Sequence, residues 1–164
     1  MKKHVPFDDA VDLLDADHKA VKKMFLDHAT LCEQSGTEED KYALAQSICQ
    51  ALTVHSQLEE EIFYPLVRDV IGKDELMEDA LEDHAQVKEV IDQIQAMNIA
   101  DPQLDSAVKV LKGLIDQHVL QEREVIFLKA RYAALDLKEI AVLLYERKQE
   151  LMLSAKAHAS KEAI

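Results

Sequence analysis

Histidine and glutamate residues recur in this sequence at a spacing that suits metal binding. In each half of the chain, a His-x-x-x-Glu pair at 55–59 or 118–122 follows an Asp-His step at 17–18 or 83–84. Side chains four residues apart lie on the same face of a helix, so each pair can present a nitrogen and an oxygen together. Imidazole and carboxylate groups are ligands for transition metals. The candidate metal ligands are His18, His55, Glu59, His84, His118 and Glu122.

The two halves of the chain repeat this pattern. Asp17-His18 matches Asp83-His84 at an offset of 66 residues, and the segment HSQLEEE at 55–61 matches HVLQERE at 118–124 at an offset of 63 residues. Each half thus offers two histidines and one inward carboxylate. We therefore expect a twofold-like dinuclear site in which each metal takes two histidines and in which Glu59 and Glu122 bridge.

Long helices must position these residues. Only three glycines and three prolines occur among 164 residues, and residues that favour helices are abundant. Apolar periodicity and capping signals predict helices over about 8–33, 37–70, 74–97, 101–132 and 137–157. Pro65 should kink or end the second one. The short connections predict an all-α fold, an antiparallel up-down-up-down four-helix bundle with an additional C-terminal helix, in one domain over 1–164 with its core at about 8–150.

Counting residues from the turns places the six candidates at one height in the bundle. At 1.5 Å per residue the offsets between neighbouring helices are only about 2–5 Å. A single histidine or a single His-x-x-x-Glu pair is usually structural. Two buried carboxylates in one layer need a cation, however, and no arginine lies on an apolar seam at that height. A metal ion is the simplest partner, and a metal-free bundle is the alternative.

The ligand types narrow the choice of metal. Structural zinc sites hold one ion with four ligands, often thiolates, whereas calcium and magnesium prefer oxygen ligands. Mixed imidazole and carboxylate ligands in a helical bundle favour iron, with manganese as the alternative. Two histidines and two bridging carboxylates would leave open positions for water, dioxygen or peroxide.

Several other polar residues are expected to stay outside the site. Lys22 and Lys88, one turn after the single histidines, could reach its edge, although solvated lysines are the simpler interpretation. Tyr64, five residues after Glu59, should point elsewhere and pack in the core. His28 lies about 15 Å along the axis from His18, at a height where we expect no facing ligands. We assign no role to His4, His28 and His158.

Composition and charge exclude other functions. The net charge of −13 argues against nucleic-acid and anionic-membrane partners, and no apolar run is long enough to cross a membrane. No signal peptide is recognisable, so we expect a cytoplasmic protein. Cys32 and Cys49 should lie about 12–14 Å apart in height, beyond disulfide reach, and remain reduced.

The ordered motifs resemble the hemerythrin-like (HHE cation-binding) family. The first helix has one histidine, followed by HSQLE at 55–59, DH at 83–84 and HVLQE at 118–122, and the segment EREVIFLKARYAALDLKEIAVLLYERKQEL is similar to the family's fourth and trailing fifth helices. The similarity runs from about Asp9 to Glu150. It implies a non-haem di-iron site that can bind oxygen, with an oxo or hydroxo bridge expected between the two irons.

Two departures from the oxygen-carrying members change the expected function. Those proteins have a second histidine four residues from the first on the third helix, where this chain has Ala80 and Lys88, and an aspartate five residues after the histidine of the fourth helix, where this chain has Arg123 after Glu122. We therefore expect a site that handles oxygen, peroxide or iron, through binding, sensing or weak peroxide chemistry. The alternative is a regulatory module in which the metal is a clamp or sensor and the fifth helix is the output surface.

Overall fold

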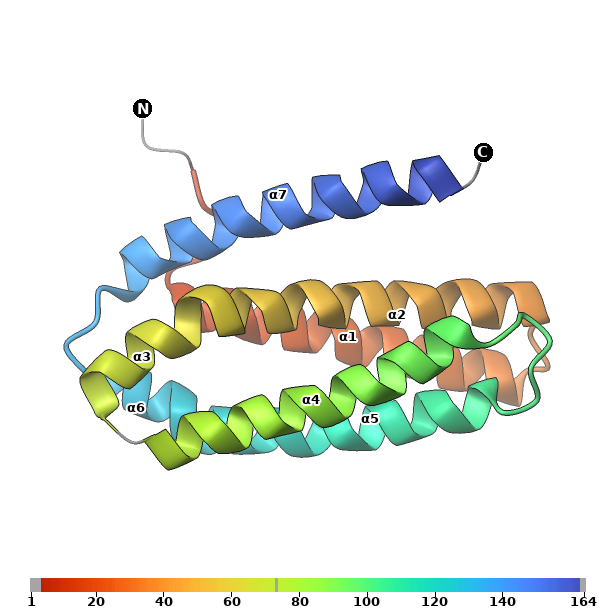
Figure 1. The fold of residues 1–164 in the computed structure, drawn as a ribbon, viewed down its shortest axis with the longest axis horizontal. Coiled ribbons are helices and arrows are strands. Elements are labelled where there is room, and N and C mark those ends of the chain that lie inside the picture. Colours follow the sequence, from red (N-terminus) through yellow and green to blue (C-terminus); the bar gives the residue numbers. More distant parts are fainter. Residues whose placement is uncertain (1–3, 73, 163–164) are drawn as a thin grey trace.

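The computed structural model describes residues 4–72 and 74–162, and every element in these ranges is helical. The elements join into five rods (Figure 1). The first is α1 (Ala10–Glu33), and the third and fifth are α4 (Asp74–Ala96) and α7 (Leu137–Glu162). The second rod consists of α2 (Glu38–Leu58), η1 (Glu59–Phe63) and α3 (Tyr64–Ile71), and the fourth of α5 (Leu104–Gln121), η2 (Glu122–Ile126) and α6 (Phe127–Tyr132). The predicted all-α class is confirmed.

The first four rods form an antiparallel bundle. Neighbouring contacts run from α1 to α2, from α2 to α4, from α4 to α5 and back from α5 to α1. The fifth rod packs on one side, against α1, α2 and η1, and runs along them in Figure 1. The prediction of four bundle helices and one additional helix is therefore confirmed. Residues 1–3, 73, 163 and 164 of the predicted domain lie outside the described part of the chain, as does the side chain of His158.

Capping side chains explain where the helices begin. Asp9 accepts a hydrogen bond from the Asp12 amide and Thr37 accepts one from the Asp40 amide, so each supplies the acceptor that a helix N-terminus lacks. Asp101 accepts from the Gln103 amide, but the helix starts later than expected, at Leu104, because residues 102 and 103 form a turn. Gly72 adopts a left-handed conformation (φ 65°) and ends α3.

Two rods contain a π-helical segment that the sequence analysis did not anticipate. The amide of Tyr64 donates to the carbonyl of Glu59, and the amide of Phe127 donates to the carbonyl of Glu122, both five residues back. Pro65 lies just after the first segment, and the second rod changes direction between α2 and α3 in Figure 1. The second segment has no proline nearby, so the wide turn does not depend on one.

Each π segment rotates the buried face of its rod by about one residue. A continuous α-helical seam predicts that Ile62 and Leu66 are buried, but both are only partly buried, and the core instead contains Phe63, Tyr64 and Val67. The fourth rod shows the same shift, with Ile126, Phe127 and Ala130 in place of Val125. The extra residue of each wide turn causes the change, because later side chains turn about 100° relative to an α-helix.

The apolar core consists of two clusters on either side of a polar layer. One cluster contains Leu14, Leu58 and Ala80 and extends to α7. The other contains Val21 and Leu52 and extends toward the far turns. Each candidate histidine falls in the chain between residues of the two clusters, so the polar layer is held between packed apolar halves. None of the helices in the described part of the chain is long and apolar enough to span a membrane.

Candidate metal centre

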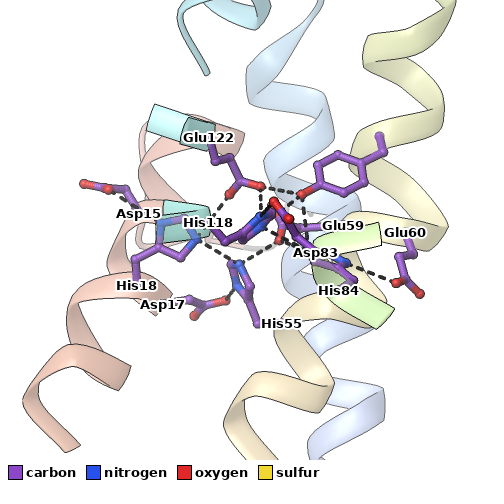
Figure 2. A network of polar contacts seen from close by, with 11 residues as sticks. Asp15, Asp17, His18, His55, Glu59, Glu60, Asp83, His84, His118 and Glu122 are labelled. Atoms are coloured by element: carbon purple, nitrogen blue, oxygen red, sulfur yellow. Dashed lines mark hydrogen bonds and ion pairs between the residues drawn. The ribbon is translucent and has the colours of Figure 1, made fainter. Parts of the chain in front are cut away.

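The polar layer contains all six predicted ligands, and they converge from four rods (Figure 2). They form two groups, each of which could hold a metal ion and each of which has its donor atoms within 4.8 Å of one another. The first group contains His18 and His55, and the second contains His84 and His118. Both groups share Glu59 and Glu122, which are 0% exposed. The two carboxylates thus lie between two pairs of histidines.

Within each pair the two imidazoles face each other through the same nitrogen. The Nε2 atoms of His18 and His55 are 3.1 Å apart, and those of His84 and His118 are 3.2 Å apart. Two unprotonated Nε2 atoms at this distance would oppose their lone pairs. Each pair therefore needs a proton or a metal ion between the nitrogens.

Carboxylates on the outer side fix the orientation of three of the histidines. The Nδ1–H of His55 donates to Asp17 at 2.9 Å, and that of His118 donates to Asp83 at 3.2 Å. His84 donates from Nδ1 to Glu60 at 3.1 Å. An imidazole that gives its Nδ1 proton to a carboxylate keeps a basic Nε2, and metal-bound histidines usually show this arrangement.

The electrostatics of the metal-free site follow from the crowding of these groups. Burial disfavours protonation of His55, but the charge of the neighbouring Glu59 and the hydrogen bond with Asp17 outweigh it, so the pKa of His55 lies well above the usual value. Burial likewise opposes ionisation of Glu59, yet His55 and His84 hold its pKa well below the usual value. The pKa of His118 rises to about 9, because contacts with Glu122 exceed the effect of burial. The site is built to hold positive charge next to two carboxylates.

The donor atoms fit a transition-metal pair. Both oxygens of Glu59 and one oxygen of Glu122 are buried without a hydrogen-bond partner in the described part of the chain, although histidine nitrogens lie 3.0–3.4 Å away. Unsatisfied buried carboxylate oxygens are costly unless a cation is present. Two imidazole nitrogens and two shared carboxylates per position match the nitrogen and oxygen preference of iron or manganese.

Tyr64 belongs to the site, and the expectation that it would point elsewhere is wrong. Its ring is buried, and its hydroxyl donates to Glu122 and lies 3.4 Å from the Nε2 atoms of His84 and His118. The error came from assuming α-helical geometry after Glu59. In a π-helical turn, residues five apart are hydrogen-bonded neighbours, so Tyr64 comes back to the face of Glu59.

The two halves of the site differ at two equivalent positions. Phe127, in the second half of the sequence, is the equivalent of Tyr64, and it stacks on the His18 ring with centroids 5.7 Å apart. Arg123 occupies the place of Glu60 and pairs with Asp15, whose carboxylate is 3.9 Å from Nδ1 of His18. The half with His84 therefore has a hydroxyl and a carboxylate, whereas the half with His18 has an apolar ring and a more distant carboxylate.

A surface pocket reaches each single histidine. One pocket, of about 460 Å³ between α2 and α4, is lined by His84 and Lys88. A second, also about 460 Å³ and between α1 and α5, is lined by His18 and Lys22. Lys22 and Lys88 are exposed, which agrees with the simpler interpretation of solvated lysines, and each lines the pocket beside its histidine.

Among the residues given no role, one has unexpected surroundings. His4 is exposed. His28 is buried, and contrary to expectation potential ligands face it: Cys32 on the same helix and Asp105 at the start of α5. That expectation overlooked Asp105, which lies in the first turn of α5 at about the height of His28. Cys32 and Cys49 are both free thiols, as expected.

Comparisons with known proteins agree with this geometry. A DNA nickase from Nostoc sp. is 28% identical over 120 residues, which cover 73% of this chain and 33% of the relative, so the chain spans about a third of the length of that protein. The crystal structure of a hemerythrin HHE cation-binding domain-containing protein from Mycobacterium kansasii has the same fold, with a TM-score of 0.75 at 18% identity over 91% of this chain and 90% of that one. The profile of the hemerythrin HHE cation-binding domain matches residues 9–130, and the chain belongs to this family.

Proposed function

We propose that this protein binds two non-haem iron ions in the polar layer and reacts with dioxygen or peroxide there. The facing Nε2 atoms in each histidine pair carry the proposal, because the outer Nδ1 atoms of His55, His84 and His118 are already committed to carboxylates. His18 and His55 would bind one ion and His84 and His118 the other. Glu59 and Glu122 would bridge the ions.

The iron pair would supply redox chemistry, and the residues of the chain would control access and protons. The pockets beside His18 and His84 give small molecules two routes to the layer. Burial and the charges of Glu59 and Glu122 raise the pKa of Tyr64 well above the usual value, so its hydroxyl stays protonated and can hold a proton at Glu122. The apolar clusters above and below exclude bulk water from the layer.

Metal analysis of the purified chain tests the ligand set. We expect two iron ions per chain and near-ultraviolet charge-transfer bands in the oxidised protein. Glu59→Gln keeps the shape of the side chain but removes its charge, and it should lower the iron content and the bands. His4→Gln, at an exposed histidine outside the layer, should behave as the parent protein. Full iron content in Glu59→Gln would contradict the bridging role.

Rapid mixing of the reduced protein with dioxygen and then with peroxide tests the chemistry. Multiple turnovers would support a peroxide- or oxygen-consuming enzyme. The missing second histidine on α4, where Ala80 and Lys88 stand, leads us to expect net oxidation rather than repeated binding and release. Reversible oxygenation over several cycles would overturn this expectation.

A second candidate function is a metal-dependent sensor, and a series of contacts between α7 and the site favours it. Lys148 on α7 pairs with Asp17 at 2.5 Å, and Asp17 accepts the Nδ1 proton of His55 at 2.9 Å. The state of the metal at His55 is thereby linked to the fifth helix through a single carboxylate. Arg147 adds a second contact from α7 to Glu61 on η1.

Hydrogen exchange along α7 distinguishes a sensor from a simple metal clamp. For a sensor, removal of the metal should increase exchange in α7, and Lys148→Met should abolish that difference while leaving the bundle helices protected. Lys23→Met, in an exposed pair with Asp27 on α1, is the matched control. Equal exchange of α7 with and without metal would rule the sensor out.

DNA nicking, which the name of the Nostoc relative states, is disfavoured for this chain. Its net charge of −13 opposes contact with a phosphate backbone, and it matches only a third of that relative. Incubation with supercoiled plasmid and manganese should leave the plasmid intact. Metal-dependent relaxation that is lost in Glu59→Gln would contradict this expectation.

A further inference from the structure

A second cluster of metal-binding side chains lies at the far end of α1, about 15 Å along the helix from the central layer. His28 and Cys32 are four residues apart on one face of α1, and Asp105 is in the first turn of α5. Sγ of Cys32 is 3.7 Å from Nδ1 of His28, and Oδ1 of Asp105 is 3.9 Å from its Nε2. One donor atom from each residue lies within 4.8 Å of the other two.

His28 is the best evidence that this cluster has a ligand. Its side chain is 3% exposed, and its Nε2 has no hydrogen-bond partner among the residues the structure describes. Burial lowers the pKa of His28 more than Asp105 raises it, so the imidazole is neutral and keeps a lone pair. A neutral buried imidazole with an unused nitrogen is a costly arrangement without a bound group.

The two carboxylate oxygens of Asp105 face different residues. Oδ2 accepts from Lys41 at 3.0 Å, whereas Oδ1 is the oxygen that faces His28. The lysine therefore holds the carboxylate in place and leaves one oxygen directed at the imidazole and the thiol. A cation bound at Oδ1 need not displace Lys41.

We propose that His28, Cys32 and Asp105 form a second metal site for a single thiophilic divalent cation of the zinc class. Nitrogen, sulfur and oxygen ligands with bonds of about 2.0–2.3 Å suit this ion, with water in the fourth position. Tetrahedral bonds of that length require donor separations of roughly 3.3–3.8 Å, so the widest pair must close by up to about 1 Å. Asp105 is partly exposed and can supply this movement by rotating its side chain.

Metal binding at this site must release a proton. Burial and the neighbouring Asp105 carboxylate raise the pKa of the Cys32 thiol, so the S–H is intact in the metal-free protein. On binding, the proton passes to solvent and the thiolate takes the metal. Cys49 gives an internal comparison, because it is fully buried among apolar side chains and burial alone raises its pKa to about 12.

Cadmium titration of the full chain, read through thiolate-to-metal absorption in the ultraviolet, tests the proposal. The central layer contains no sulfur ligand, so a thiolate band must come from one of the two cysteines, Cys32 or Cys49. We expect the band in the parent protein and in Cys49→Ala, its absence in Cys32→Ser, and its displacement by zinc. His28→Gln and Asp105→Asn should each weaken cadmium binding at least about tenfold. Losing a residue that only orients a metal ligand already costs about 10–100-fold in affinity, and these two residues would be ligands themselves.

Three results would overturn the second site. The parent protein could show no band, the band could disappear with Cys49 rather than Cys32, or His28→Gln and Asp105→Asn could both bind cadmium as tightly as the parent. The last result would mean that a thiol alone captures the metal. Asp105 is the safer of the two substitutions because it is partly exposed, and circular dichroism of each variant verifies folding.

Discussion

Replacing Tyr64 with phenylalanine removes one hydroxyl and changes little else. In the metal-free protein this hydroxyl donates to the buried carboxylate of Glu122. A hydrogen bond to a charged group contributes about 1.5–3 kcal/mol to stability. Phenylalanine fits the same space, as Phe127 does at the equivalent position, so little packing energy should be lost.

Urea denaturation of the metal-free protein measures this contribution. With a slope of about 2 kcal/mol per molar urea, Tyr64→Phe should lower the midpoint by about 0.7–1.5 M without changing the slope. Tyr132→Phe is the control, since Tyr132 is 89% exposed and its substitution should change stability by less than about 0.5 kcal/mol. Equal midpoints for the two variants would show that the hydroxyl does not hold Glu122 in solution, and the proton role proposed for Tyr64 would fall with it.

Three further outcomes follow from the same geometry. Chelation of the metal should lower the thermal midpoint, since a ligand at a hundred times its dissociation constant stabilises the native state by about 2.7 kcal/mol; an unchanged melting curve would mean that no metal was bound. Asp17→Asn and Asp83→Asn should each weaken metal binding about 10–100-fold in a chelator competition, because both carboxylates orient a histidine, whereas the exposed Asp116→Asn should not. In the metal-free protein the stabilisation from protonated His118, whose folded pKa is about 9 against 6.5, should be complete below pH 6.5 and lost as the pH rises through 9; denaturation midpoints that stay flat across this range would contradict it.

The sequence was sufficient to predict the helical bundle and to predict that the six His and Glu side chains lie in one layer of it. Helical spacing and the short turns determine the height of a residue to within about one turn, and that accuracy brought His18, His55, His84 and His118 together. The same reasoning could not identify the outer carboxylates. Asp17 and Asp83 each precede a site histidine, so on a helix they point about 100° away from it, toward a histidine on the neighbouring rod.

The missed residues share a physical cause. A π-helical turn depends on one extra backbone residue and has no fixed side-chain pattern, so periodicity could not place Tyr64 or Phe127. The repeat of His-x-x-x-Glu-x-Glu in both halves marks where the two π segments lie, but it does not show a change of pitch. The partner of His28 was missed because only residues on the apolar face of each helix were considered. Asp105 lies beside the apolar face of α5 that Leu104 and Val108 form.

The repeat within the chain has a consequence for how such a site can vary. If the layer were assembled from two identical hairpins, every substitution would occur on both sides at once, and Tyr64 could not face a phenylalanine across the site. Here both hairpins belong to one polypeptide, so each side can change alone. Tyr64 against Phe127 and Glu60 against Arg123 are such independent changes. A single chain can therefore place different chemical groups on the two sides of the layer, which two identical subunits could not do.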